Sequence, residues 1–250
     1  MTMPERSERI AVIIPTYNEK DNIVRIISQM LSVLQSVGKS HEIVVVDDNS
    51  PDGTASLVQS LQSRHENIIL LQRSGKLGLG SAYMEGYKRA LRDGVSCIIQ
   101  MDADLSHPPT TALDLLAAIE EGYDIAIGSR YIHGGGVKAW TWKRRIMSKG
   151  ANYLVRAVLR TGLRDNTSGY RAMSVASVKE LMRYEIRSSG FSYLVEAAVV
   201  LSRIQLKIKE IPFTYEGRER GDTKLSFGEI MRFFITVCRL LVFGTQRKRI

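Results

Sequence analysis

The sequence predicts an α/β protein, a single domain in which helices flank a mainly parallel central sheet. Three observations lead to this class. Short, wholly apolar runs recur along the first half of the chain, as is typical of strands buried on both faces of a parallel sheet. Segments with apolar residues at helical spacing lie between these runs. Strand and helix alternate regularly, which favours right-handed crossovers between parallel strands.

The individual elements follow from local patterns. Residues 10–14 are all apolar and predict the first strand, while residues 22–37 carry their apolar side chains on one face of a helix. Residues 206–212 alternate and end at a proline, which is typical of an edge strand. We expect further strands at 42–47, 67–71, 95–101 and 123–128, a loop at 165–171, and helices from Asp52 or Thr54 to Arg64 and at 81–92, 110–121, 140–159, 175–184, 193–204 and 230–243.

The composition is that of an ordinary globular protein. The 250 residues are 44% hydrophobic and 24% charged, which excludes the disordered and fibrous classes. Cys97 and Cys238 lie far apart in apolar segments, so we expect reduced, buried thiols and a cytoplasmic setting. The chain shows no repeat or linker, and the predicted organisation is a polar N-terminal tail over 1–9, one domain over 10–225, and a C-terminal amphipathic basic helix and tail over 226–250.

The most apolar segment of the chain is residues 230–243. It is shorter than the roughly 20 residues that a spanning helix needs, and Arg232 and Arg239 interrupt it, so it is not expected to cross a bilayer alone. A helix at a membrane surface or on a membrane-embedded partner fits the pattern, with residues 247–249 near anionic head groups. A helix packed on the core fits equally well, and both interpretations stay open.

Positive charge is concentrated in one segment. The formal net charge is +9, and residues 125–164 contain nine Lys or Arg but no Asp or Glu. Such a block can bind nucleic acid, anionic lipid or a phosphorylated substrate, and it can also be a solvated basic face.

Polar side chains follow three predicted strands at the point where each strand ends. Ligands bind at the carboxyl ends of the strands in open α/β sheets, so we expect these side chains to converge on one crevice. Neither the glycine loop of a dinucleotide-binding fold nor a Walker phosphate loop is present, because Pro-Thr-Tyr-Asn-Glu follows the first strand and residues 75–80 lack Gly-Lys-Ser/Thr. The convergent residues are Pro15, Tyr17 and Glu19; Asp47 and Asp48; and Asp102, Asp104 and Ser106.

Asp102 and Asp104 lie between a buried strand and two prolines. A carboxylate pair of this kind can share Mg²⁺, which takes one or two carboxylates and fills its other positions with water and phosphate oxygens. A surface turn is the plain alternative, but the convergence of three strand ends argues for the metal. The four histidines are scattered without zinc spacing, and we expect His107 to be part of the turn.

Eight short motifs stand in order along the chain: Ile13-Ile-Pro-Thr-Tyr-Asn-Glu19, Val45-Val-Asp-Asp48, Lys76-Leu-Gly-Leu-Gly80, Asp102-Ala-Asp-Leu-Ser-His107, Gly128-Ser-Arg-Tyr131, Lys143-Arg-Arg-Ile-Met-Ser-Lys-Gly150, Asp165-Asn-Thr-Ser-Gly-Tyr-Arg171 and Arg218-Glu-Arg-Gly-Asp-Thr-Lys-Leu225. Together they resemble the inverting family-2 glycosyltransferases of the GT-A fold. The last three motifs narrow the resemblance to the dolichol-phosphate mannose synthases, or polyprenyl-phosphate mannosyltransferases. It covers residues 10–225, and the ordered set is specific although each motif is weak.

The resemblance implies a GDP-mannose donor, a dolichyl or other polyprenyl phosphate acceptor, and Mg²⁺ or Mn²⁺. Asp102, Asp104 and Ser106 would hold the metal, although relatives often carry Gln at the position of Ser106. The implied donor-binding residues are Pro15, Tyr17, Glu19, Val46, Asp48, Asp102, Ala103, Asp104, Arg130, Arg218 and Lys224. The implied acceptor-phosphate residues are Arg130, Arg144 and Ser148, and those implied in catalysis are Asp104, Arg130 and Arg144.

The charge of the implied acceptor determines the expected chemistry. A phosphate monoester is anionic near neutral pH, so it can attack the anomeric carbon without a strong general base, while arginine forks orient its oxygens. Glu196 is the nearest candidate for a base, and we expect it to be structural. The expected product is a β-linked lipid-phosphate mannose. We expect the protein to be peripheral on the cytosolic face of a membrane, which in a eukaryote is that of the endoplasmic reticulum. Small membrane-embedded subunits are expected as further partners.

Three alternatives stay open. The nearest is a polyprenyl-phosphate glucosyltransferase using UDP-glucose, since nothing in the sequence distinguishes guanine from uracil at Asp48. An inert nucleotide-binding subunit of a membrane complex is the second. Nucleic-acid binding is the third, and it is disfavoured because an acidic crevice would repel nucleic acid.

Overall fold

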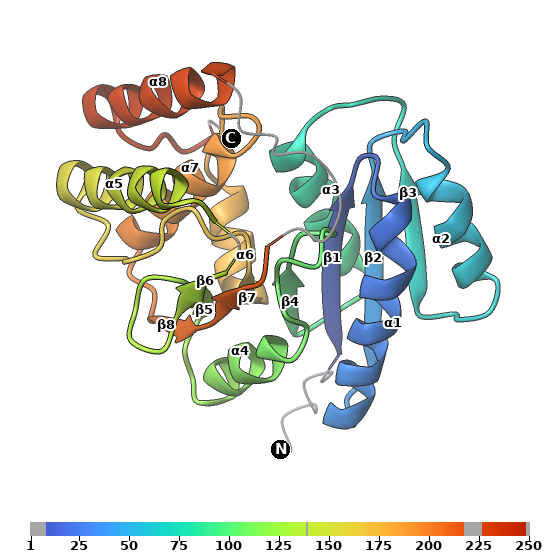
Figure 1. Cartoon of the computed structure of the whole chain (residues 1–250). Helices are drawn as coiled ribbons and strands as arrows, with labels where there is room; N and C mark the ends of the chain where they lie inside the picture. Colours follow the sequence, from blue (N-terminus) through green and yellow to red (C-terminus); the bar gives the residue numbers. More distant parts are fainter. Residues whose placement is uncertain (1–8, 139, 218–226, 249–250) are drawn as a thin grey trace.

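The computed structural model describes residues 9–138, 140–217 and 227–248. A seven-stranded sheet with the order β3-β2-β1-β4-β7-β5-β8 forms its centre, and β6 and β9 form a small second sheet (Figure 1). The strands are β1 Ile10–Thr16, β2 His41–Asp47, β3 Ile68–Gln72, β4 Cys97–Gln100, β5 Ile125–Ser129, β6 Gly136–Val137, β7 Arg171–Ser174, β8 Ile208–Pro212 and β9 Thr214–Tyr215. The helices are α1 Lys20–Val37, α2 Thr54–Gln62, α3 Leu79–Arg92, α4 Thr111–Glu120, α5 Trp142–Leu159, α6 Val175–Met182, α7 Ser192–Arg203 and α8 Phe227–Phe243.

The central sheet is mainly parallel, as predicted. β1 pairs in parallel with β2 and β4, β2 with β3, and β5 with β8. Each predicted strand and helix is present with its ends shifted by a few residues, and β8 occupies an edge. The α/β class with helices around a mainly parallel sheet is therefore confirmed.

The prediction was wrong at β7. The sequence predicts a loop over 165–171 and then a helix, whereas Arg171–Ser174 forms a strand that runs antiparallel between β4 and β5. Four residues that pass directly into α6 are too few to show a strand period. The two-residue strands β6 and β9 were missed for the same reason.

Helices cover both faces of the sheet (Figure 1). α1, α2 and α4 pack on one face through residues such as Ile26, Val58 and Leu115. α3, α6 and α7 pack on the other face through residues such as Tyr87 and Leu194. The central strands β1, β2 and β4 are largely apolar because both faces of the sheet lie against helices.

α5 and α8 form an outer layer on α7. Val155, Val199 and Leu240, one from each of these helices, belong to one apolar cluster, and α5 and α8 lie side by side beyond α7 in Figure 1. Residues 192–201 of α7 are all buried, because the sheet layer covers one side of the helix and the outer layer covers the other.

α8 packs on the core through one face and exposes the other. Thr236, Val237 and Leu240 are buried. Cys238 is exposed, which corrects the prediction that both thiols are buried, because only one side of α8 is covered; Cys97 is buried as expected. In the described parts of the chain, no helix is both long enough and apolar enough to span a membrane. The exposed apolar side chains of α8 are Phe227, Met231, Phe234, Ile235, Leu241, Val242 and Phe243.

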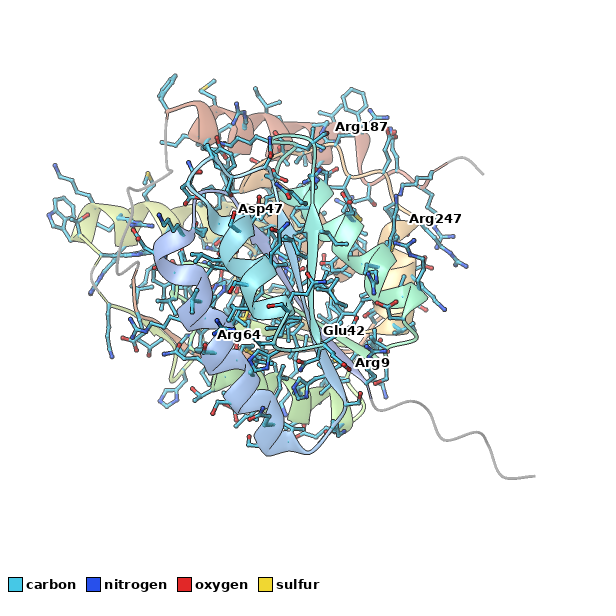
Figure 2. All side chains as sticks on the ribbon, turned by 90° about the vertical axis from the view of Figure 1, so that its right-hand side faces the viewer. Arg9, Glu42, Asp47, Arg64, Arg187 and Arg247 are labelled. Atoms are coloured by element: carbon cyan, nitrogen blue, oxygen red, sulfur yellow. The ribbon has the colours of Figure 1, made fainter. Side chains whose placement is uncertain are left out.

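The two ends of the sheet differ, and Figure 2 shows Glu42 and Asp47 at opposite ends of β2. Glu42 pairs with Arg9 at 2.6 Å, and burial raises the pKa of Glu42 although Arg9 acts in the opposite direction. Asp47 accepts hydrogen bonds from the Thr16 hydroxyl at 2.8 Å and the Ser50 backbone N–H at 2.8 Å. An ion pair thus closes the amino end, and the carboxyl end carries the loops of the site.

Candidate active site

A cleft of about 540 Å³ lies at the carboxyl ends of β1, β2 and β4. Val46 is fully buried in the core, and Arg130 lines a neighbouring cavity. Arg218 and Lys224 lie outside the described residues. The predicted donor residues that line the cleft are Pro15, Tyr17, Glu19, Asp48, Asp102, Ala103 and Asp104.

The turn after β4 brings two carboxylates into this cleft. Ser106 donates its backbone N–H at 3.1 Å and its hydroxyl at 2.5 Å to Asp104 Oδ1, and Leu105 adopts a φ of 62° within the turn. His107 Nδ1 accepts the backbone N–H of Asp102 at 3.1 Å. Burial lowers the pKa of His107, although the charges of Asp102 and Asp104 raise it. His107 therefore belongs to the turn as a neutral ring.

The carboxylate pair fits a divalent cation that is shared with a substrate. Asp104 is 3% exposed and the Asp102 side chain 27%. The described residues hold no cluster of three or more His, Cys, Asp or Glu side chains able to bind a metal on their own. Mg²⁺ suits a pair of carboxylates when substrate phosphates complete its coordination. Ser106 donates its hydroxyl to Asp104 and so orients that carboxylate.

The Asp102 carboxylate occupies the space that a side chain at position 169 would take. β4 and β7 pair with Gln100 opposite Arg171, and continuing this register by two residues puts Asp102 opposite Gly169. A Cβ on Gly169 would lie 3.2 Å from Asp102 Oδ1 and 3.6 Å from His107 Cε1. The absence of a side chain at Gly169 therefore determines where Asp102 can lie.

We expect Gly169→Ala to push the Asp102 carboxylate aside and to raise the Kd for Mn²⁺ about tenfold, because a displaced ligand loses affinity. Titration calorimetry measures this Kd. Gly136→Ala is the control, since the nearest atom to its added Cβ is 3.6 Å away, and it should bind as the wild type does. An unchanged Kd in Gly169→Ala would contradict the argument.

A buried ion pair holds Asp48 in the cleft. Arg73 Nη1 donates to Asp48 Oδ1 at 2.5 Å, and the Gly78 backbone N–H donates to Oδ2 at 2.8 Å. Arg73 Nη2 donates to the Ser81 hydroxyl at 2.6 Å. These bonds tie the end of β2 to the start of α3, so both Asp48 oxygens are engaged by the protein.

Several residues of the cleft were not predicted. Lys76 Nζ lies 4.0 Å from the centre of the Tyr17 ring, and residues 189–191, Glu229 and Arg232 also line the cleft. The Lys76-Leu-Gly-Leu-Gly80 motif could have indicated Lys76. The other residues come from a loop and from α8, which carry no chemical pattern, so only the tertiary structure reveals them.

A second cavity, of about 590 Å³, opens beside the cleft and is bounded by α5, α7 and α8. Asp102, Asp104, Phe191 and Glu229 line both spaces. The rest of the second cavity is largely apolar, with side chains that include Met147, Leu154, Leu194, Val195, Ile230, Phe233 and Phe234. An acidic space and an apolar space therefore meet at the carboxylate pair.

The second cavity also contains the predicted acceptor residues Arg130, Arg144 and Ser148. Arg144 and Ser148 are four residues apart on α5 and so share one face of the helix. The Arg144 guanidinium lies 4.3 Å from the Trp140 ring centre, and Ser148 accepts the Tyr131 hydroxyl at 2.6 Å. The structure thus brings the three residues to one space.

Arg130 is held by a buried carboxylate. Its Nε and Nη2 donate to the two Asp165 oxygens at 2.7 and 2.8 Å, and Nη2 also donates to Thr167 at 2.7 Å. Burial raises the pKa of Asp165, but the charge and hydrogen bonds of Arg130 outweigh it and hold that pKa below its usual value. The fork of Arg130 is therefore bonded to the protein beside the acceptor residues.

The sequence is similar to proteins of known activity. The glycosyl transferase family 2 model matches residues 11–182. A polyprenol monophosphomannose synthase of Mycolicibacterium smegmatis is 37% identical over 239 residues, which cover 95% of this chain and 89% of that protein. A dolichol-phosphate mannosyltransferase of Pyrococcus furiosus is 38% identical over 244 residues, which cover 97% of this chain and 66% of that protein.

The fold also matches solved structures. Mannosyl-3-phosphoglycerate synthase from Rubrobacter xylanophilus aligns with a TM-score of 0.66 at 17% identity, over 93% of this chain and 72% of that one. Glucosyl-3-phosphoglycerate synthase from Mycobacterium tuberculosis, in complex with Mn²⁺, UDP and glucosyl-3-phosphoglycerate, aligns with a TM-score of 0.62 at 16% identity, over 94% and 79%. These matches confirm the GT-A fold. From the family match and the two relatives, the chain belongs to glycosyl transferase family 2.

Proposed function

We propose that this protein transfers mannose from GDP-mannose to a dolichyl or other polyprenyl phosphate, with inversion at the anomeric carbon. The product is a β-linked lipid-phosphate mannose. The observation that carries the proposal is the junction of an acidic cleft with an apolar, arginine-lined cavity at Asp102 and Asp104. A nucleotide sugar and a lipid phosphate need these two kinds of space side by side. The names of the two relatives support mannose and a polyprenyl carrier.

The donor occupies the cleft. Pro15, Tyr17, Glu19 and Asp48 surround the nucleotide, with Val46 behind them in the core. The diphosphate lies against Asp102, Ala103 and Asp104, with Arg218 and Lys224 as further donor residues. A bound Mg²⁺ or Mn²⁺ would stabilise the charge that develops on the departing diphosphate. A structural neighbour that was solved with Mn²⁺ and a nucleotide supports the use of a divalent ion in general.

The lipid phosphate occupies the second cavity. Arg144 and Ser148 on one face of α5 bind its oxygens, and the apolar side chains between α5 and α8 accept the first units of the lipid. Arg130 adds positive charge there while Asp165 fixes its orientation. The phosphate and the donor carry like charges, so these cations allow the two to approach.

The attacking oxygen belongs to the phosphate and needs no strong base. Glu196 on α7, which the sequence indicates as the nearest candidate for a general base, is 2% exposed. It accepts the backbone N–H of Arg187 at 3.2 Å and of Ser188 at 2.8 Å, and it pairs with Arg239 of α8 at 2.7 Å. It lines neither of the two spaces at the carboxylate pair, which supports a structural role.

The lipid substrate requires access to a membrane, and we propose that α5 and α8 supply it. Trp142, Ile146 and Tyr153 of α5 are 67%, 62% and 67% exposed. The helix α8, which also exposes apolar side chains, lies beside α5 (Figure 1). Basic residues of α5 would lie among anionic head groups. The protein would then act peripherally at the cytosolic face, alone or with a small membrane-embedded subunit.

We expect that replacing Ile235, Leu241 and Val242 together by serine lowers binding to phosphatidylcholine–phosphatidylserine vesicles at least about tenfold, because apolar insertion is lost. Co-sedimentation measures the bound fraction. These side chains are 62%, 58% and 70% exposed, so folding should be retained. The control replaces two exposed apolar residues elsewhere, Val24 of α1 and Leu113 of α4, by serine. Equal loss in both proteins would contradict docking through α8.

A transfer assay tests the function itself. The protein is incubated with radiolabelled GDP-mannose and dolichyl phosphate in vesicles, with Mn²⁺, Mg²⁺ or EDTA, and lipid-extractable label is counted. We expect label in the lipid fraction with either metal and little with EDTA. A parallel incubation with UDP-glucose tests the glucosyltransferase alternative. Lipid-linked glucose without lipid-linked mannose would overturn the donor assignment, and no transfer from either donor would favour an inert nucleotide-binding subunit.

A further inference from the structure

Arg171 at the start of β7 is a fully buried cation. Its Nη2 donates to the Leu194 carbonyl at 2.9 Å, while Nε and Nη1 have no hydrogen-bond partner among the described residues. Within the same described residues, no carboxylate forms an ion pair with it. A buried charge without a counter-ion is costly for folding. Buried polar groups left unsatisfied in this way call for an explanation beyond stability.

Arg171 lies on the same face of the sheet as Asp102. Gln100 is opposite Arg171 in the β4–β7 register. The Gln100 side chain accepts the Tyr87 hydroxyl and donates to the Gly169 carbonyl at 2.9 Å. Side chains two residues apart along a strand point to the same face of the sheet. Asp102 therefore shares this face with Gln100, and position 169 shares it with Arg171. On this face, the Gln100–Arg171 pair is therefore the next pair into the sheet after the Asp102–Gly169 pair.

Tyr83 of α3 connects the buried region to the site. Its hydroxyl donates to Asp102 Oδ1 at 3.4 Å, and its ring stacks on Tyr193 with centroids 5.7 Å apart. The Tyr83 hydroxyl therefore links Asp102 to the buried face of α3.

We propose that Arg171 and Tyr83 are positioning residues for the donor site: Tyr83 orients the Asp102 carboxylate, and the buried Arg171 charge supplies a fixed positive potential beneath the donor diphosphate. This inference rests on the proposed function, since it assigns the diphosphate to the cleft. A preorganised charge in a water-excluded interior acts strongly and needs no rearrangement during reaction. Because it is buried, added salt screens it little. The potential also offsets the repulsion between Asp102, Asp104 and the diphosphate.

The test of Arg171 compares binding with stability. Arg171→Met removes the charge and keeps much of the volume, and Arg171→Lys keeps the charge. We expect Arg171→Met to raise the calorimetric Kd for GDP with Mn²⁺ about tenfold, to the same extent in low salt and in about 0.5 M salt. Its melting temperature should equal or exceed that of the wild type, because an unpaired buried charge is gone. Arg171→Lys should recover most of the affinity. A lower melting temperature with unchanged affinity would overturn the inference.

The test of Tyr83 uses the same aromatic stack as its control. Tyr83→Phe removes only the hydroxyl bonded to Asp102, and we expect it to weaken Mn²⁺ binding in the presence of GDP about tenfold, measured by electron paramagnetic resonance of free Mn²⁺. Tyr193→Phe, the same change on the neighbouring ring, should bind as the wild type does. If Arg171→Met does not fold, Tyr83→Phe decides, and unchanged Mn²⁺ affinity overturns the inference. Failure of the wild type to bind GDP with Mn²⁺ would instead overturn the proposed function.

Discussion

Asp104→Asn should lower the transfer of mannose to lipid by about a thousandfold, because it removes a charged oxygen where the leaving diphosphate must be stabilised. Asparagine keeps the size of the side chain and an oxygen that can accept from Ser106, whose backbone N–H and hydroxyl both donate to Asp104 Oδ1. The turn should therefore persist, and the melting temperature should change little. The lipid-extraction assay with GDP-mannose and Mn²⁺ measures the loss.

The control for Asp104→Asn is Asp114→Asn. Asp114 is an exposed carboxylate on α4, so the same chemical change there should leave transfer within about twofold of the wild type. If Asp104→Asn retained transfer at the metal concentration used for the wild type, the assignment of Asp104 as a metal ligand would be wrong.

Arg130→Met should destabilise the fold by about 3–5 kcal/mol, because it leaves the Asp165 carboxylate buried without its partner. Asp165 is fully buried, and both of its oxygens accept from the Arg130 guanidinium. Urea unfolding followed by circular dichroism measures the loss. The double variant Arg130→Met with Asp165→Leu should recover part of the stability, since no unpaired charge remains.

The same pair predicts how stability changes with pH. The folded-state pKa of Asp165 lies below its unfolded value, so its contribution is present above the unfolded pKa of about 3.9 and is lost as pH falls towards the folded value. Urea midpoints at several pH values should therefore fall less steeply on the acid side in the double variant.

The control for Arg130→Met is Lys138→Ala, which breaks an exposed pair with Glu216 and should change stability by less than about 1 kcal/mol. An equal loss in Lys138→Ala and Arg130→Met would contradict the role of burial.

The sequence predicted the parts of the fold that depend on repeated burial. β1 and β2 could be predicted because each is covered on both faces and so contains few polar residues. β7 could not, because its four residues include Arg171 and its place between β4 and β5 depends on pairing with distant segments. The buried side of α8 was equally undetermined, since an apolar helix pattern does not indicate which residues meet the core.

The site was predictable where chemistry is local in sequence. Asp102, Asp104 and their turn follow from one short motif at one strand end. Tyr83 was not predictable, because in sequence it is an ordinary apolar position of α3 and only the fold brings its hydroxyl to Asp102. The ion pairs that engage Asp48 and Arg130 were missed for the same reason, since their partners lie 25 and 35 residues away.

The reversed direction of β7 has a consequence for how the site could evolve. Parallel strands contribute to one edge of a sheet only the loops that leave them. The amino end of β7 lies at the carboxyl ends of β4 and β5, so the segment that arrives at β7 reaches this edge as well. That arriving segment brings Asp165 to Arg130 and Gly169 to Asp102. A change of strand polarity thus provides a second source of loops, whose sequence can vary separately from that of the departing loops.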